Sequence, residues 1–186
     1  ERTGINIKQA ASDATASLHF NIKKAGFELP VVADSANSGE REAYILSISS
    51  KGINIEANTS TGLYYAVQTI RQLIAVKDGK ASLPAVTIKD KPALAFRGMM
   101  MDFAHGGLLT VDEIKRQIDF LARWKTNQYY FYNEISISMD GYPTLNYGAN
   151  YTQADIKEII AYGKERHIDA IRVVALYGHL HEMIRN

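Results

Sequence analysis

The first half of the chain alternates apolar and polar residues and then changes to the period of a helix. Residues 44–49 and 53–57 are two alternating stretches joined by Ser50-Lys51-Gly52, which is the pattern of a half-buried β-hairpin. Either Ser60 or Thr61 is expected to cap the helix that follows. Apolar residues at helical spacing predict one buried face on that helix: Leu63, Ala66, Val67, Ile70, Leu73 and Ile74.

A turn at Gly79 leads to another extended stretch, residues 83–88. The polar segment 89–92, which ends in proline, is typical of a domain boundary. We therefore predict a small α+β domain over residues 1–90, with an antiparallel sheet that begins near Gly26 and packs against the helix.

The second half reads as buried strands separated by amphipathic helices. Residues 96–103, 129–132 and 168–176 are apolar enough to be strands buried on both faces. Thr110 and Thr152 each begin a capping sequence, with an acidic residue three positions later. The apolar stripes of the two helices are Ile114, Ile118, Leu121 and Ala122, and then Ile156, Ile159, Ile160 and Tyr162. This order predicts an α/β domain over residues 91–186 with a parallel sheet and right-handed crossovers.

Three parallel strands are too few for a closed (β/α)8 barrel, which needs eight. Natural domains also avoid ending a sheet on an open apolar edge. The fold class expected is therefore a small α+β domain followed by an incomplete TIM barrel of about three strands. An open three-stranded α/β domain is the alternative.

Composition limits the classes of function. The 186 residues are 46% hydrophobic and 22% charged, and the net charge is +1 from 21 basic and 20 acidic residues. The scattered basic residues do not predict a nucleic-acid surface. No apolar run approaches the roughly 20 residues of a membrane span, and the absence of cysteine excludes disulfides. The chain begins at Glu1, so we expect any targeting segment to have been removed.

Four ordered motifs resemble glycoside hydrolase family 20. They are Thr61-Gly62-Leu63-Tyr64-Tyr65 with Gln68-Thr69-Ile70, then Phe96-Arg97-Gly98, then Lys125-Thr126-Asn127, and finally Tyr177-Gly178-His179. The resemblance covers the chain from about Gly26 onward. It implies the front portion of an exo-acting β-N-acetylhexosaminidase, secreted or periplasmic, that acts on glycans ending in N-acetylhexosamine and needs the rest of the barrel.

The resemblance also implies a mechanism without a cofactor. In this family the substrate's own 2-acetamido oxygen attacks the anomeric carbon, which is an exception to the usual pair of protein carboxylates. An Asp orients the amide and a Glu protonates the leaving oxygen. That Asp-Glu pair follows the fourth strand, so we expect it beyond Asn186 and no catalytic residue within this chain.

Departures from the family pattern favour a distinct branch. Tyr132-Asn133-Glu134-Ile135 stands where typical members have His-Leu-Thr-Asp-Asp-Gln, and this is similar to the branch related to hexosaminidase D. Arg172 and Tyr177 each stand where prolines are usual. The alternative function is a carbohydrate-binding or structural module with the same fold and no hydrolysis.

The expected substrate-binding or supporting residues are Arg97, Asp102, Glu134 and His179. The resemblance implies that Arg97 binds sugar hydroxyls, and that Glu134 and His179 hydrogen-bond near the acid/base Glu. The alternatives are an anchor of the domain boundary for Arg97, a fixed strand-end loop for Asp102, a salt bridge for Glu134 and a helix cap for His179.

Three further features have simpler explanations. His105 lies between the first strand of the barrel and two glycines. It is a weaker candidate for the rim where the carboxyl ends of the barrel strands meet and active sites are built. Tyr129 to Tyr132 can stack on sugars, but buried strand aromatics are usually core. His179 and His181 lie two residues apart and do not share a helix face, so no metal site is predicted.

Overall fold

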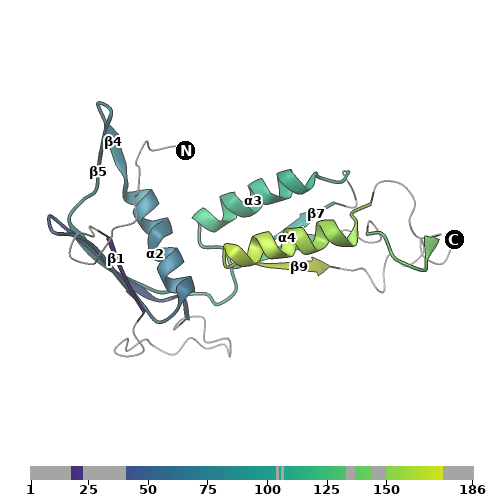
Figure 1. The fold of residues 1–186 in the computed structure, drawn as a ribbon, viewed down its shortest axis with the longest axis horizontal. Coiled ribbons are helices and arrows are strands. Elements are labelled where there is room, and N and C mark those ends of the chain that lie inside the picture. Colours follow the sequence, from purple (N-terminus) through teal and green to yellow (C-terminus); the bar gives the residue numbers. More distant parts are fainter. Residues whose placement is uncertain are drawn as a thin grey trace. The chain divides into compact units, whose positions relative to one another are not determined.

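The structure is a computed structural model that describes residues 18–22, 41–103, 105, 107–132, 137–143 and 150–173. The chain divides into two compact units, an N-terminal unit over Glu1–Ala95 and a C-terminal unit over Phe96–Asn186. Figure 1 shows a helix-covered sheet in each of them. None of the described helices is long and apolar enough to cross a membrane.

The sheet of the N-terminal unit has the strand order β1-β3-β2-β6. Its strands are β1 (Leu18–Ile22), β2 (Tyr44–Ser49), β3 (Gly52–Ala57) and β6 (Val86–Asp90). The predicted hairpin is confirmed, because β2 and β3 pair antiparallel with Ser49 opposite Gly52. The prediction of an antiparallel sheet starting near Gly26 is confirmed for β2, β3 and β6 and is wrong for β1, which precedes that residue and pairs parallel with β3. Strand β1 does alternate apolar and polar residues, with His19 and Asn21 between three apolar side chains, but it was not among the predicted strands.

Helix α2 (Ser60–Leu73) covers this sheet. Its N-cap is Thr59, whose side-chain hydroxyl accepts a hydrogen bond from the Gly62 amide at 3.4 Å, so neither Ser60 nor Thr61 is the cap that we expected. Thr61 is instead buried, and Ser60 is exposed. The predicted apolar face does pack on the sheet. The fully buried part of this core consists of Tyr44, Leu46, Ile48, Ile55, Ala57, Tyr65 and Ala66.

A second hairpin, which the sequence pattern did not predict, follows α2. Strands β4 (Ala75–Lys77) and β5 (Lys80–Ser82) are exposed along their whole length. Asp78 and Gly79 join them with φ values of 50° and 72°. Two consecutive left-handed residues are the geometry of a tight type I′ turn, so the turn at Gly79 is explained by local backbone conformation and not by a buried sheet.

The C-terminal unit repeats strand and helix as predicted. Its elements are β7 (Gly98–Asp102), α3 (Val111–Arg123), β8 (Gln128–Tyr132), α4 (Gln153–Glu165) and β9 (Asp169–Val173). The strands are parallel in the order β7-β8-β9, and α3 and α4 lie side by side along them (Figure 1). Thr110 caps α3, and Thr152 forms a full capping box with Asp155 at the start of α4.

The strands of this unit are buried less evenly than expected. In β8, Tyr129 and Phe131 are fully buried, whereas Tyr130 and Tyr132 on the other face are half-buried. Within these 186 residues, Met99 and Met100 of β7 are 44% and 63% exposed. Among the described strands β7 pairs only with β8, which makes it an edge strand.

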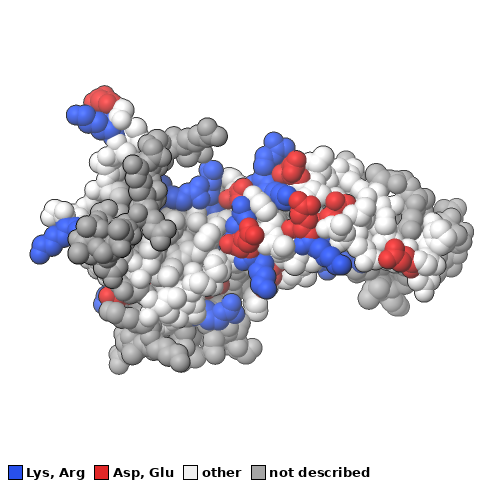
Figure 2. Space-filling model, viewed as in Figure 1, with Lys and Arg blue, Asp and Glu red and all other residues white. Residues whose placement is uncertain are grey.

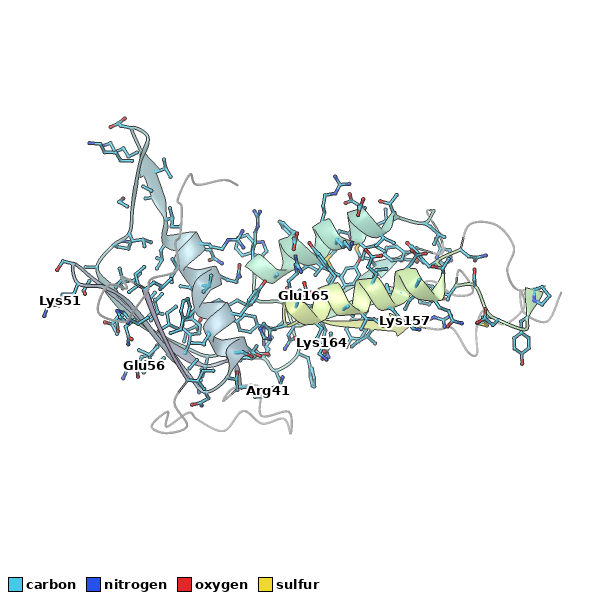
Figure 3. The ribbon with its side chains drawn as sticks, in the orientation of Figure 1. Arg41, Lys51, Glu56, Lys157, Lys164 and Glu165 are labelled. Carbon is cyan, nitrogen blue, oxygen red and sulfur yellow. The ribbon has the colours of Figure 1, made fainter. Side chains whose placement is uncertain are left out.

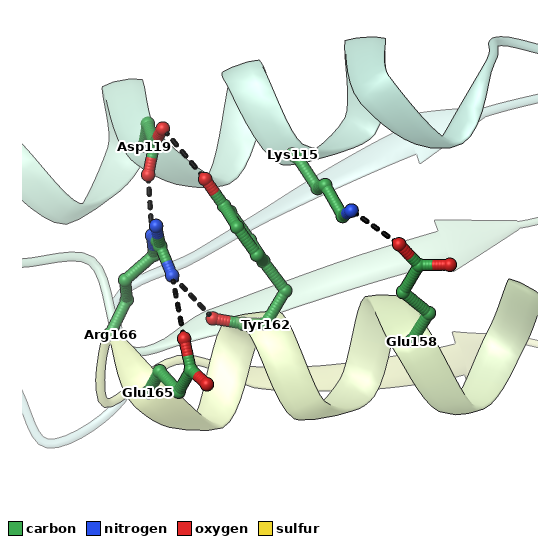
Figure 4. A network of polar contacts seen from close by, with 6 residues as sticks. All are labelled: Lys115, Asp119, Glu158, Tyr162, Glu165 and Arg166. Carbon is green, nitrogen blue, oxygen red and sulfur yellow. Dashed lines mark hydrogen bonds and ion pairs between the residues drawn. The ribbon is translucent and has the colours of Figure 1, made fainter.

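Polar contacts join α3 to α4 on their outer side (Figure 4). Arg166 forms an ion pair with Asp119, and its guanidinium carbon lies 3.3 Å from the ring centroid of Tyr162. The Tyr162 hydroxyl donates to the same Asp119 carboxylate at 2.9 Å, and Lys115 pairs with Glu158. Figure 2 shows acidic and basic side chains interspersed on this side, and Figure 3 shows Lys157, Lys164 and Glu165 along α4. These charges form a solvated helix surface.

Candidate functional site

The carboxyl ends of the three parallel strands place a set of polar side chains together. Asp102 and Tyr132 are the last residues of β7 and β8 and lie opposite each other in the ladder. Paired residues of parallel strands point to the same face of the sheet. Tyr129 marks the helix-covered face, because its hydroxyl donates to Gln117 of α3 at 2.6 Å. Asp102 and Tyr132 therefore lie on the opposite face, at the carboxyl end, which is where active sites of such barrels are built.

Both carboxylate oxygens of Asp102 are directed at His105. One oxygen, Oδ2, lies 2.7 Å from the His105 Nδ1 atom, and the other accepts from the His105 backbone amide at 3.3 Å. The pair is accessible, with 47% of the Asp102 side chain and 62% of the His105 side chain exposed. Asp102 thus contacts both the backbone and the side chain of His105.

Tyr132 supports the imidazole of His105 from the neighbouring strand. The two rings are parallel to within 4°, with centroids 6.4 Å apart. His105, the weaker candidate by sequence, is thus brought together with Asp102 and Tyr132. Successive residues of a strand point to opposite faces, so the period of two separates Tyr132 from the core residues Tyr129 and Phe131.

Tyr151, which the sequence pattern did not indicate, links the segment before α3 to the segment after β8. It is buried, and its hydroxyl donates to the Leu109 carbonyl at 2.7 Å in the segment before α3. Its backbone carbonyl accepts from the Ser138 amide at 2.9 Å, after β8. Its ring meets Phe103 edge-on, with centroids 6.3 Å apart. Burial raises the pKa of Tyr151 to about 12, so its hydroxyl stays a donor at neutral pH.

Arg97 lies at the other end of β7. It precedes Gly98, and a five-residue strand separates it from the end of Asp102 by roughly 16 Å at about 3.3 Å per residue. Its Nε–H donates to the Lys125 carbonyl at 2.8 Å, and its amide donates to the Asn127 side chain at 2.9 Å. The Lys125–Asn127 turn therefore holds Arg97 at the amino ends of β7 and β8. The structure does not place Arg97 on the same rim as Asp102.

Two expected site residues, Glu134 and His179, lie outside the described residues, and so do Tyr177 and His181. Arg172 lies within β9, where burial lowers the pKa of its guanidinium. Within the described ranges, no group of three or more histidine and acidic side chains is arranged to hold a metal ion. The described rim thus consists of an oriented carboxylate–imidazole pair beside a tyrosine ring, which can bind hydroxyl groups.

Comparison with known proteins matches both units to one family. Residues 1–91 match the family described as "Glycosyl hydrolase family 20, domain 2". Residues 94–186 match the family described as "Glycosyl hydrolase family 20, catalytic domain". A β-hexosaminidase of Porphyromonas gingivalis is 26% identical over 92% of this chain and 25% of its own length. A chitooligosaccharidolytic β-N-acetylglucosaminidase of Bombyx mori is 32% identical over 79% of this chain and 29% of its own length.

Solved structures support the same assignment. The chitobiase of Flavobacterium johnsoniae superposes with a TM-score of 0.81 and 27% identity, over 98% of this chain and 28% of that protein. The chain thus spans about a quarter of the length of the relatives it matches. Both family descriptions occur in order, and the parallel strands are those of the barrel's start. The chain belongs to glycoside hydrolase family 20, as the small domain and the first part of the catalytic barrel.

Proposed function

We propose that the full-length protein is an exo-acting β-N-acetylhexosaminidase that removes terminal N-acetylhexosamine from glycans. The observation that supports this most is the consecutive match of the family's domain 2 and its catalytic domain to the two halves of the chain. Relatives named β-hexosaminidase, chitobiase and β-N-acetylglucosaminidase point to the same class of substrate. The domain division proposed is residues 1–90 for the small domain and 91–186 for the barrel portion.

The proposed reaction is substrate-assisted hydrolysis with retention. The 2-acetamido oxygen of the substrate attacks the anomeric carbon, and the leaving oxygen takes a proton from a Glu. An adjacent Asp orients the amide and stabilises its developing positive charge. Both carboxylates follow the fourth strand of the barrel, which comes after Asn186 in this numbering. Water then opens the cyclic intermediate, with the same Glu as base.

This chain supplies residues that support that chemistry. We assign Glu134 and His179 to hydrogen bonds near the acid/base Glu, where a carboxylate–imidazole pair tunes the proton affinity of the acid. We assign Arg97 to hydroxyls of the terminal sugar, with its guanidinium reaching up from the start of the first barrel strand. Its bond to the Lys125 carbonyl uses one of the five N–H donors of the guanidinium and fixes the direction of the group. Asp102 supports the rim through His105.

The test is hydrolysis of a chromogenic N-acetyl-β-glucosaminide by two purified proteins, the full-length protein and the 186-residue chain. We expect turnover by the full-length protein and none by the chain alone, because the chain lacks the groups that protonate the leaving oxygen and stabilise the intermediate. Turnover by the chain alone would overturn the placement of the Asp-Glu pair. Binding of N-acetylglucosamine without turnover by the full-length protein would support a carbohydrate-binding module instead.

A further inference from the structure

Tyr151 joins the two connections that follow β7 and β8. Its hydroxyl donates at 2.7 Å to the carbonyl of Leu109, which lies between β7 and α3. Its backbone carbonyl accepts from the Ser138 amide at 2.9 Å, and Tyr151 forms an isolated parallel bridge with Ile137, after β8. Its ring meets Phe103, the residue after β7, edge-on. One residue thus fixes the two connections to each other.

These contacts lie in the interior of the C-terminal unit. Tyr151, Phe103 and Ile137 are 4%, 3% and 6% exposed. A buried hydroxyl that loses its acceptor has no water to replace it, so the bond to Leu109 favours a single arrangement of the two connections. Tyr151 also immediately precedes Thr152, whose capping box starts α4. Both connections are therefore attached to a buried point beside a helix.

The segment after β8 includes an expected site residue. In the sequence, Glu134 lies between Tyr132, the last residue of β8, and Ile137, which is bridged to Tyr151. Only residues 133–136 lie between these two anchors. A short connection that is fixed at both ends has few conformations left to lose. In a (β/α)8 barrel, the connections at the carboxyl ends of the strands build the active site.

We propose that Tyr151 is a positioning residue of the active site, which holds the segment that carries Glu134 in place against the segment after β7. The inference rests on the proposed function, in which Glu134 tunes the acid/base Glu. In this role Tyr151 touches neither the sugar nor the acid. A displacement of about 1 Å at a catalytic group can cost about a hundredfold in rate, so the anchor affects turnover.

Two buried tyrosines of the same unit allow a matched comparison. Tyr151→Phe keeps the ring and the backbone bridge and removes only the hydroxyl bond to Leu109. Tyr129→Phe also removes one hydroxyl bond, at 2.6 Å to Gln117, but on the helix-covered face of the sheet. Tyr129 is fully buried as well. The two variants should therefore lose similar stability, and only Tyr151→Phe should lose activity.

The measurements use the full-length protein. They are thermal melts, and steady-state kinetics with the chromogenic N-acetyl-β-glucosaminide at a temperature below both melting points. We expect both variants to melt earlier than the wild type by a similar amount. Tyr151→Phe should lower kcat about tenfold with KM nearly unchanged, because Glu134 is assigned to the acid and not to sugar binding. Tyr129→Phe should keep the wild-type kcat and KM.

A double-mutant cycle with Glu134→Gln tests whether Tyr151 acts through Glu134. If it does, Tyr151→Phe should have little further effect on kcat once Glu134 is replaced. Independent losses of kcat that multiply in the double variant would contradict the inference. If Tyr151→Phe does not fold, Phe103→Leu enters the same cycle, because it removes the ring contact and keeps the hydroxyl bond.

Wild-type kcat in Tyr151→Phe, or an equal loss of kcat in Tyr129→Phe, would also overturn the inference and leave the proposed function intact. Absence of turnover by the wild-type full-length protein would instead refute the proposed function, and this inference with it.

Discussion

Arg97 and Asn127 hold each other through two hydrogen bonds at the amino ends of β7 and β8. The Arg97 amide donates to the Asn127 side-chain oxygen at 2.9 Å, and the Asn127 amide donates to the Arg97 carbonyl at 3.0 Å. The Asn127 carbonyl in turn accepts from the Asp169 amide at 2.9 Å, at the start of β9. One residue thus sets the starting points of three parallel strands.

We expect Asn127→Ala to lower the free energy of unfolding by about 1–2 kcal/mol, because it leaves the half-buried Arg97 amide without its acceptor. Asn127→Asp keeps an oxygen in place and should recover most of the loss. Chemical denaturation of the full-length protein measures both variants. An alanine variant with the wild-type midpoint would show that water replaces the side chain at no cost.

Gly62 is required by the close approach of α2 to the segment before β2. A Cβ at this position would lie 2.5 Å from the Ala43 carbonyl oxygen and 2.8 Å from the Ala57 Cβ atom. We expect Gly62→Ala to cost about 1–3 kcal/mol, as for other overpacked cores. Ser60→Ala, at an exposed position of the same helix, is the control and should change the free energy of unfolding, measured by denaturant titration, by less than about 0.5 kcal/mol.

Leu46 and Ile55 face each other in the fully buried core of the N-terminal unit. Leu46→Ala should cost about 2–5 kcal/mol, because it removes a buried side chain and leaves a cavity. Leu73→Ala should cost less, since Leu73 is only half-buried at the end of α2. Equal losses for the two variants, measured by denaturant titration, would contradict this ranking.

The raised pKa values of two buried tyrosines predict that the protein loses stability at alkaline pH. Burial raises the pKa of Tyr151 to about 12, and burial together with the Asp90 carboxylate raises the pKa of Tyr44. A raised pKa means that the folded state keeps a proton which the unfolded state releases near its ordinary pKa of about 10. The stabilisation is therefore complete below pH 10 and declines as pH rises toward 12.

The measurement is the denaturant midpoint of the full-length protein at several values of pH between 8 and 12. Tyr151→Phe and Tyr44→Phe should each make the decline shallower, because each removes one of the titrating groups. If the denaturant midpoint of the wild type stays constant up to pH 12, the raised pKa values assigned to Tyr151 and Tyr44 are refuted.

If the full-length protein is the proposed enzyme, Arg97 and His179 should affect different kinetic constants. Arg97→Ala should raise KM about ten- to a hundredfold, since it removes charge-assisted bonds to sugar hydroxyls. His179→Ala should lower kcat by a similar factor and alter one limb of the pH profile, because its proposed role is to tune the acid. If both variants melt at the wild-type temperature and keep the wild-type kcat/KM at every pH, neither residue takes part in binding or catalysis.

Much of the architecture was predictable, because periodicity reports which face of an element is buried. The stripe of Ile114, Ile118, Leu121 and Ala122 is buried as predicted, and both threonine caps begin their helices. The failures have local causes. The cap at Thr59 is one residue earlier than expected, since Thr61 is taken into the core, and Ile160 is 44% exposed although it fits the helical stripe.

The site was harder to predict, because its contacts join residues from different strands. Periodicity gave no reason to pair His105 with Tyr132, which lies 27 positions later and opposite Asp102. Arg97 begins the first barrel strand as expected, and its bond to the Lys125 carbonyl at the amino end of β7 is a contact that the sequence did not indicate. Sequence spacing identifies the strands, and only the register shows which side chains meet.

The order in which the C-terminal unit pairs its elements has a consequence for synthesis of the protein. Strands β8 and β9 each pair with the strand before them in the chain, and Arg166 after α4 pairs with Asp119 of α3. Every contact can thus form as soon as its second partner leaves the ribosome, without waiting for later parts of the polypeptide. Among the described strands the other edge of β7 is unpaired, and the exposed methionines of this strand make it a surface on which newly made chains can associate.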